Sequence, residues 1–74
     1  MSAYLIVVLL LLPRTDGPPL QQELHQELMS ASTPEVCKRR AEVLAEQQRQ
    51  KHIEVVRKTR GLVVGECRSL GSLT

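Results

Sequence analysis

The sequence predicts an all-α protein with no compact core, and three features of the 74-residue chain lead to this prediction. An uninterrupted apolar run near the start ends at a proline. Two polar segments then carry apolar residues at the spacing of an amphipathic helix. The chain has one tyrosine, no tryptophan and no phenylalanine, and aromatic side chains supply much of the buried area of cores. A polypeptide of this size and composition is not expected to enclose a substrate pocket.

The apolar run extends from Tyr4 to Leu12 and is closed by Pro13. We expect residues 1–12 to form a short membrane-seeking helix. At ~1.5 Å per residue this helix reaches only about 18 Å, against about 30 Å of hydrocarbon. Three interpretations stay open. The run is a short membrane anchor, a secretory signal peptide that ends near Gly17, or a segment buried in an assembly.

Residues 13–19 form a linker, because three prolines, a glycine and an aspartate in seven residues cannot continue a helix. The next segment, 20–31, is predicted to be a short amphipathic helix. Its leucines Leu20, Leu24 and Leu28 recur every four residues and would form one narrow stripe. Such a stripe needs a surface to pack against, because an isolated helix this short is not stable in water.

A longer basic helix is expected over residues 34–60. Thr33 can cap this helix, Pro34 suits its first position, and Gly61 is a good terminator. The remaining segment, 61–74, has no clear period and is predicted to be a flexible tail.

Positive charge is concentrated in the second helix. Between Lys38 and Arg60 the chain has eight Lys or Arg residues against three Glu, an excess that suits the headgroups of an anionic membrane. Nucleic acid is not an expected partner, because no aromatic residues lie between the cations and no recognition motif is present. The candidate lipid-binding residues are Arg39, Arg40, Arg49 and Lys51, and the candidate residues for a partner protein are Leu20, Leu24, Leu28, Leu44 and Val55.

The sequence contains no recognisable catalytic, cofactor-binding or metal-ligating set. His25 and His52 lie on different predicted helices, without carboxylates or cysteines at ligand spacing. There is no nucleophile motif and no glycine-rich phosphate loop. Cys37 and Cys67 either form one disulfide in an oxidising compartment or are two free thiols. We therefore expect a protein that is not an enzyme and that needs no cofactor.

The order of these features resembles the small mitochondrial assembly factors of the ubiquinol–cytochrome c reductase complex (complex III). The resemblance covers residues 4–60 and is carried by Leu12-Pro13, Leu20-Gln21-Gln22-Glu23-Leu24, Pro34-Glu35, Arg39-Arg40 and Gln47-Gln48 before Val55-Val56. It implies a protein of the mitochondrial inner membrane with a helical tail in the intermembrane space. It also implies a role in the maturation of cytochrome b and contact with cardiolipin.

These observations together predict a membrane-anchored helical assembly or scaffolding factor. The alternative is a secreted peptide precursor with a signal peptide that ends near Gly17. The two differ in the fate of residues 1–12, which the first keeps in a membrane and the second removes.

Overall fold

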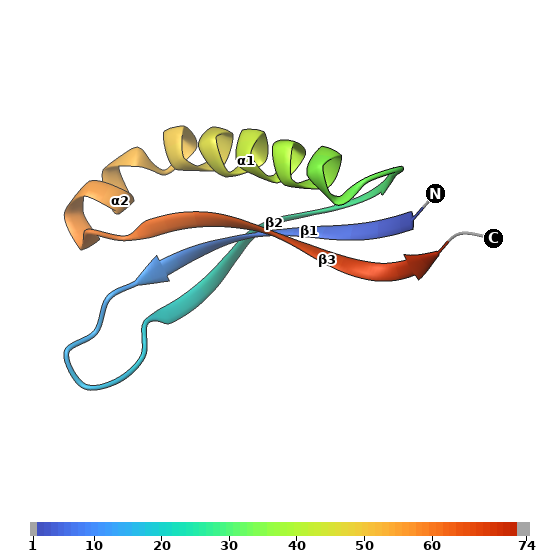
Figure 1. The fold of residues 1–74 in the computed structure, drawn as a ribbon. Coiled ribbons are helices and arrows are strands. Elements are labelled where there is room, and N and C mark those ends of the chain that lie inside the picture. Colours follow the sequence, from blue (N-terminus) through green and yellow to red (C-terminus); the bar gives the residue numbers. More distant parts are fainter. Residues whose placement is uncertain (1, 73–74) are drawn as a thin grey trace.

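The computed structural model describes residues 2–72, and strands as well as helices are present (Figure 1). A three-stranded antiparallel sheet forms one layer, and the helices lie on one side of it. The all-α fold class predicted from the sequence is therefore wrong. In chain order the elements are β1 (Ser2–Leu12), β2 (Leu20–Ala31), α1 (Pro34–Lys51), α2 (Ile53–Thr59) and β3 (Leu62–Ser72).

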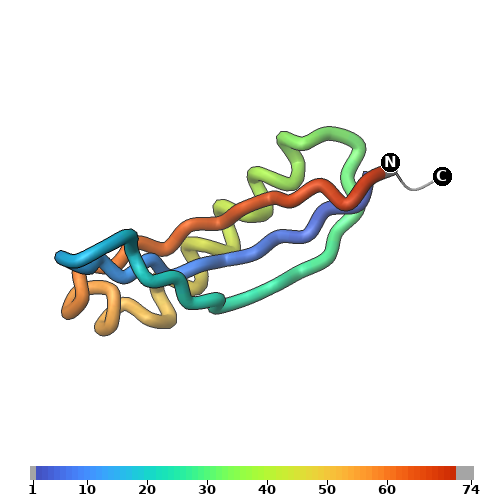
Figure 2. The backbone as a smooth tube through the Cα atoms, turned by 90° about the horizontal axis from the view of Figure 1, so that it is seen from below, coloured from blue at the N-terminus to red at the C-terminus, as the bar shows by residue number. Residues whose placement is uncertain are grey.

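The N-terminal apolar run is the central strand of the sheet. β1 pairs antiparallel with β2 on one side and with β3 on the other, as Figure 2 shows from the face opposite the helices. The β-branched residues Ile6, Val7 and Val8 favour an extended strand, and a central position lets the strand pair its backbone groups on both sides. The prediction of a membrane helix over residues 1–12 is wrong. None of the helices described is both long and apolar enough to cross a membrane.

β2 occupies the segment that the leucine spacing assigns to a helix, so that prediction is also wrong. A spacing of four residues returns to the same face of a strand as well, and the pattern does not separate the two structures. Leu24 is an extra residue in the pairing of β2 with β1, which shifts the register. Leu24 consequently packs against the core, whereas Leu28 is 71% exposed.

A small core lies between the sheet and α1, which corrects the prediction that the chain has none. α1 can approach β3 closely because Gly65 has no side chain: a Cβ there would lie 2.5 Å from the carbonyl oxygen of Ala41. Close approach of small residues provides the packing contacts that aromatic side chains supply elsewhere. The residues buried between the layers include Tyr4, Ile6, Val8, Ala31, Cys37, Ala41 and Leu44.

The basic helix expected over residues 34–60 is divided in two. α1 begins at Pro34 and ends at Lys51, and His52 departs from helical geometry. α2 then ends before Arg60, whose φ of 55° lies in the left-handed region. The chain reverses direction there and enters β3.

β3 takes the place of the flexible tail predicted for residues 61–74, and over the described residues that prediction is wrong. The strand pairs with β1 from Leu62 to Ser72. Its first residues suit a strand, and β1 has a second side to which they can bond.

A disulfide between Cys37 of α1 and Cys67 of β3 links the helix layer to the sheet. The two Cα atoms are 6.2 Å apart, and the cysteines are separated by 30 positions in the sequence. Of the two states that the sequence leaves open, the structure shows the disulfide, and both cysteines of the chain take part in it. The crosslink fixes the start of α1 against the middle of an edge strand.

Candidate interaction surface

The side of the sheet opposite the helices has no covering element in the described part of the chain (Figure 1, Figure 2). Side chains alternate between the two faces of a strand, and Ile6 and Val8 point toward α1. Leu5, Val7 and Leu9 therefore point to the uncovered side, which we call the open face. Val7 and Leu9 are nevertheless only 2% and 7% exposed, because side chains of the two outer strands flank them.

Exposed leucines lie at both ends of the open face. At one end Leu28 of β2 is opposite Leu5 in the register, and it lines a shallow hollow together with Leu70 of β3. At the other end Leu62 of β3 is opposite Leu11. The exposed fractions of Leu28, Leu62 and Leu70 are 71%, 59% and 56%. Exposed apolar side chains therefore lie at two separate places on the open face, and exposed apolar surface is a feature of interaction sites.

The middle of the open face is charged. Glu66 is opposite Val7 and Arg68 is opposite Leu5, and Arg68 Nη2 lies 3.1 Å from Glu66 Oε2. Their side chains are 48% and 56% exposed. A negative and a positive charge thus lie side by side between the exposed leucines, and β2 adds Gln26 opposite Val7 and Glu23 opposite Leu9.

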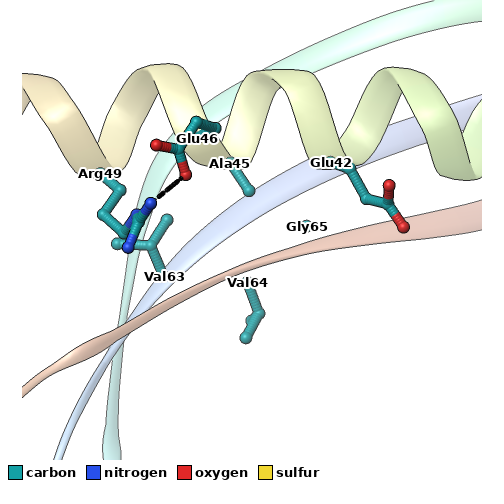
Figure 3. Close-up of a pocket in the computed structure, with 7 residues that line it drawn as sticks. All are labelled: Glu42, Ala45, Glu46, Arg49, Val63, Val64 and Gly65. Carbon is teal, nitrogen blue, oxygen red and sulfur yellow. Dashed lines mark hydrogen bonds and ion pairs between the residues drawn. The ribbon is translucent and has the colours of Figure 1, made fainter.

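A second feature is a groove of about 340 Å³ between α1 and β3, shown in Figure 3. Arg49 donates hydrogen bonds to Glu46. Hydrogen bonds from Gln50, and then from Arg49, hold the pKa of Glu46 below its ordinary value. The lining contains no histidine, serine, threonine or cysteine; it consists of Glu42, Ala45, Glu46, Arg49, Val63, Val64 and Gly65.

The groove therefore offers no set of groups arranged for catalysis. Residues 2–72 also contain no group of three or more His, Cys, Asp or Glu side chains placed to hold a metal ion. The open face is the stronger candidate for a functional surface.

An ion-pair cluster on the helix side joins β2 to α1. Arg40 donates two hydrogen bonds to the Glu27 carboxylate, at 2.8 Å from Nε and 3.0 Å from Nη2. His25 Nε2 is 3.9 Å from Glu27 and has no hydrogen-bond partner in the structure. The hydrogen bonds from Arg40 are the main cause that holds the pKa of the Glu27 carboxyl below its ordinary value, and burial acts in the opposite sense.

The Glu27–Arg40 pair should make the protein more stable at neutral pH than in acid. A carboxyl whose pKa is lowered by folding stabilises fully above its unfolded-state pKa, about 4.5 here. The contribution is lost as the pH falls through the folded-state value. We expect Glu27→Gln to lower the thermal midpoint at neutral pH only modestly, since the pair is partly exposed. We also expect the thermal midpoint of this variant to fall less steeply than that of the unchanged protein as the pH is lowered into the acid range.

The matched control for this prediction is Glu54→Gln, at an exposed position on α2. Thermal unfolding followed by circular dichroism between neutral pH and about pH 3 measures both variants. The control should reproduce the profile of the unchanged protein. An acid limb of the same steepness in both variants would contradict the role given to Glu27.

The five apolar residues predicted to bind a partner do not share a surface. Leu44 is buried in the core, and Leu24 packs against it. Leu20 lies at the start of β2 and Val55 on α2, and both are exposed. Leu28 alone belongs to the open face, because the helical stripe that grouped the leucines does not exist.

The four cations predicted to contact lipid all lie exposed on α1. Arg40 and Arg49 each form an ion pair with a glutamate. Arg39 borders a hollow on the outer surface of the helix, and Lys51 is the last residue of α1. Two of the four guanidinium and ammonium groups are therefore engaged within the protein.

The open-face residues of β3 are not among the residues predicted to bind a partner. Because residues 61–74 are predicted to be a flexible tail, the sequence assigns no role to Leu62, Leu70, Glu66 and Arg68. The signal that could have indicated them is the run Leu62-Val63-Val64 at the start of this segment, because valines favour strands.

No protein-family model, curated protein or solved structure matches the chain. The geometry defines a class: a small, disulfide-linked protein of two layers, with helices over one face of a sheet and an uncovered second face of mixed apolar and polar side chains.

Proposed function

We propose that the protein is a small, non-enzymatic interaction module that binds a partner protein on the open face of its sheet. The observation that carries the proposal is the composition of β1, in which every residue from Tyr4 to Leu12 is apolar. A strand with one covered face alternates apolar and polar residues, whereas a continuous apolar run is typical of strands covered on both faces. α1 covers one face of β1, and side chains of β2 and β3 flank Val7 and Leu9 on the other. A partner protein would complete this second cover at the two ends of the face, where the outer strands expose their leucines.

The exposed leucines of the outer strands support the same function. Full burial of a leucine side chain contributes about 1.5–3 kcal/mol. Covering Leu28, Leu62 and Leu70, which are all more than half exposed, therefore provides several kcal/mol toward association. This contribution works against the loss of translational and rotational freedom on binding.

The proposed role keeps the assembly or scaffolding function predicted from the sequence, but it moves the contact from a membrane helix to a sheet. Association with complex III and cytochrome b, contact with cardiolipin and a mitochondrial location stay predictions of the sequence resemblance. The disulfide supports a place in an oxidising compartment. A secreted form with this fold has to keep β1, because cleavage near Gly17 would remove the central strand.

Site-specific photo-crosslinking in the cells that produce the protein tests the docking function. A photoreactive residue at Leu28 or Leu62 should yield a covalent adduct of defined mass with a protein. The adduct should disappear when Leu70→Lys is introduced elsewhere on the same face. Val43 is the matched control position, because it is 47% exposed on α1, on the other side of the molecule.

The control position should give no such adduct. An absence of adducts from both open-face positions, or equal labelling at Val43, would reject the open face as the binding surface.

A further inference from the structure

We infer that the partner on the open face is a second copy of this chain, packed face to face about a twofold axis. The inference rests on the proposed function and names its partner. The axis lies between the two sheets at right angles to the strands, at the level of Ile6 and Cys67, which are opposite each other in the register. β1 of one copy then lies antiparallel over β1 of the other, as in the aligned packing of twisted sheets.

The charges on β3 select this position of the axis. Glu66 and Arg68 lie on either side of Cys67 and share the open face. The axis therefore places Glu66 over Arg68 of the second copy, and the same contact is made twice, as in any isologous interface. An axis one residue away, at Glu66, would place the two Glu66 carboxylates together, and like-charge repulsion disfavours that arrangement.

The apolar side chains match about the same axis. Leu5 is opposite Arg68 and Val7 is opposite Glu66, so Leu5 lies over Val7 of the second copy. Val64, which is level with Leu9, faces the level of Ala3 and Gly71 in the second copy, and Leu70 is the extra residue of β3 beside that level. Along β3 the open face has an apolar, an acidic, a basic and an apolar residue in that order: Val64, Glu66, Arg68 and Leu70. A different partner would need a surface with the same order, which a second copy of the chain already has.

The open face has the area of a weak dimer interface. Its outer and central strands have 11 or 12 residues, which at ~3.3 Å per residue makes the face about 36 Å long. Three strands ~4.8 Å apart make it about 14 Å wide. The axis at Ile6 overlaps residues 2–10 of the two β1 strands, so the two faces bury about 800 Å² together, a size typical of weak, transient interfaces.

Edge-to-edge pairing of β3 is the competing arrangement, because β3 is an edge strand with a free side. A twofold axis at Cys67 perpendicular to the sheet would also bring Glu66 to Arg68 of the second copy. That arrangement leaves Leu28, on the far strand β2, uncovered. Face-to-face packing places Leu28, which is level with Leu5, over Gln26 of the second copy, which is level with Val7, so this leucine distinguishes the two.

Sedimentation equilibrium of the purified, disulfide-bonded chain tests the inference. The unchanged protein should dimerise, and Glu66→Arg and Arg68→Glu should each weaken the dimer at least tenfold, because each places like charges together. An equimolar mixture of the two variants should dimerise again, and so should the double reversal Glu66→Arg/Arg68→Glu. Lys58→Glu, a charge reversal at an exposed position of α2, should leave dimerisation unchanged.

Leu28→Lys should weaken the dimer as well, and circular dichroism should show that every variant keeps its fold. A chain that stays monomeric at millimolar concentration overturns the inference. A dimer whose dissociation constant does not change with the charge reversals overturns it as well. A dimer that responds to the charges but not to Leu28→Lys is paired by its edges, which also overturns it. Crosslinking of Leu28 and Leu62 to a different protein would uphold the docking function and reject the second copy.

Discussion

Reduction of the Cys37–Cys67 disulfide is expected to lower the free energy of unfolding by about 3–4 kcal/mol. A crosslink restricts the unfolded chain, and the chain-entropy relation gives this loss for cysteines 30 positions apart. Small domains are stable by only ~5–15 kcal/mol in total, so the loss is a large share. With a urea dependence of ~1 kcal/mol per molar, the unfolding midpoint should fall by about 3–4 M, as measured by circular dichroism with and without reductant.

The double variant Cys37→Ala/Cys67→Ala is the control for effects of the reductant itself. It should be at least as unstable as the reduced protein, since Cys37 is fully buried and its truncation also loses packing. Its midpoint should not respond to reductant. If thiol titration confirms complete reduction of the unchanged protein and the midpoint does not move, the disulfide does not stabilise this fold.

Local signals in the sequence show where the chain turns, because they depend on single residues. The prolines of the segment 13–19 prevent a regular element there in any fold. Pro34 starts α1 because its fixed φ and missing N–H suit the first turn of a helix. Such signals mark where an element begins or ends, but they do not specify its type when the pattern between them is ambiguous.

The type of the first two elements depends on pairing between distant residues, which local patterns do not contain. A short apolar run without alternation fits a buried strand and a buried helix equally. It is a strand here because Leu11 at its end pairs with Leu62, far along the chain. The leucines of 20–31 are spaced by four residues, which is close to one helical turn and is also two strand periods.

The candidate site was even less accessible to sequence reasoning than the fold, because the register of three strands creates it. Glu66 and Arg68 have no particular meaning in a flexible tail. In β3 they lie on the same face as Val7 and acquire a position relative to the leucines. The one sequence feature that indicates the open face is β1 itself, which is too continuously apolar for a strand covered on one side.

A chain that begins at Pro18 is expected to lose its folded structure completely. This is the product that the secreted-precursor alternative implies, with removal of everything up to Gly17. The truncation removes the strand with which both β2 and β3 pair, and it takes Ile6 and Val8 out of the core. The backbone groups of β2 and β3 then have no partner. Far-UV circular dichroism should lose its strand contribution, and thermal unfolding should lose its cooperative transition.

A chain that begins at Ser2 is the matched control, and it should unfold with the cooperativity of the complete protein. Retained cooperative unfolding in the chain from Pro18 would mean that α1, β2 and β3 build a core without β1. It would also remove the basis of the docking proposal, because the open face is centred on that strand. If the chain from Pro18 fails to fold and the chain from Ser2 folds, residues 2–12 are a structural part of the protein. Every form with this fold then has to retain them.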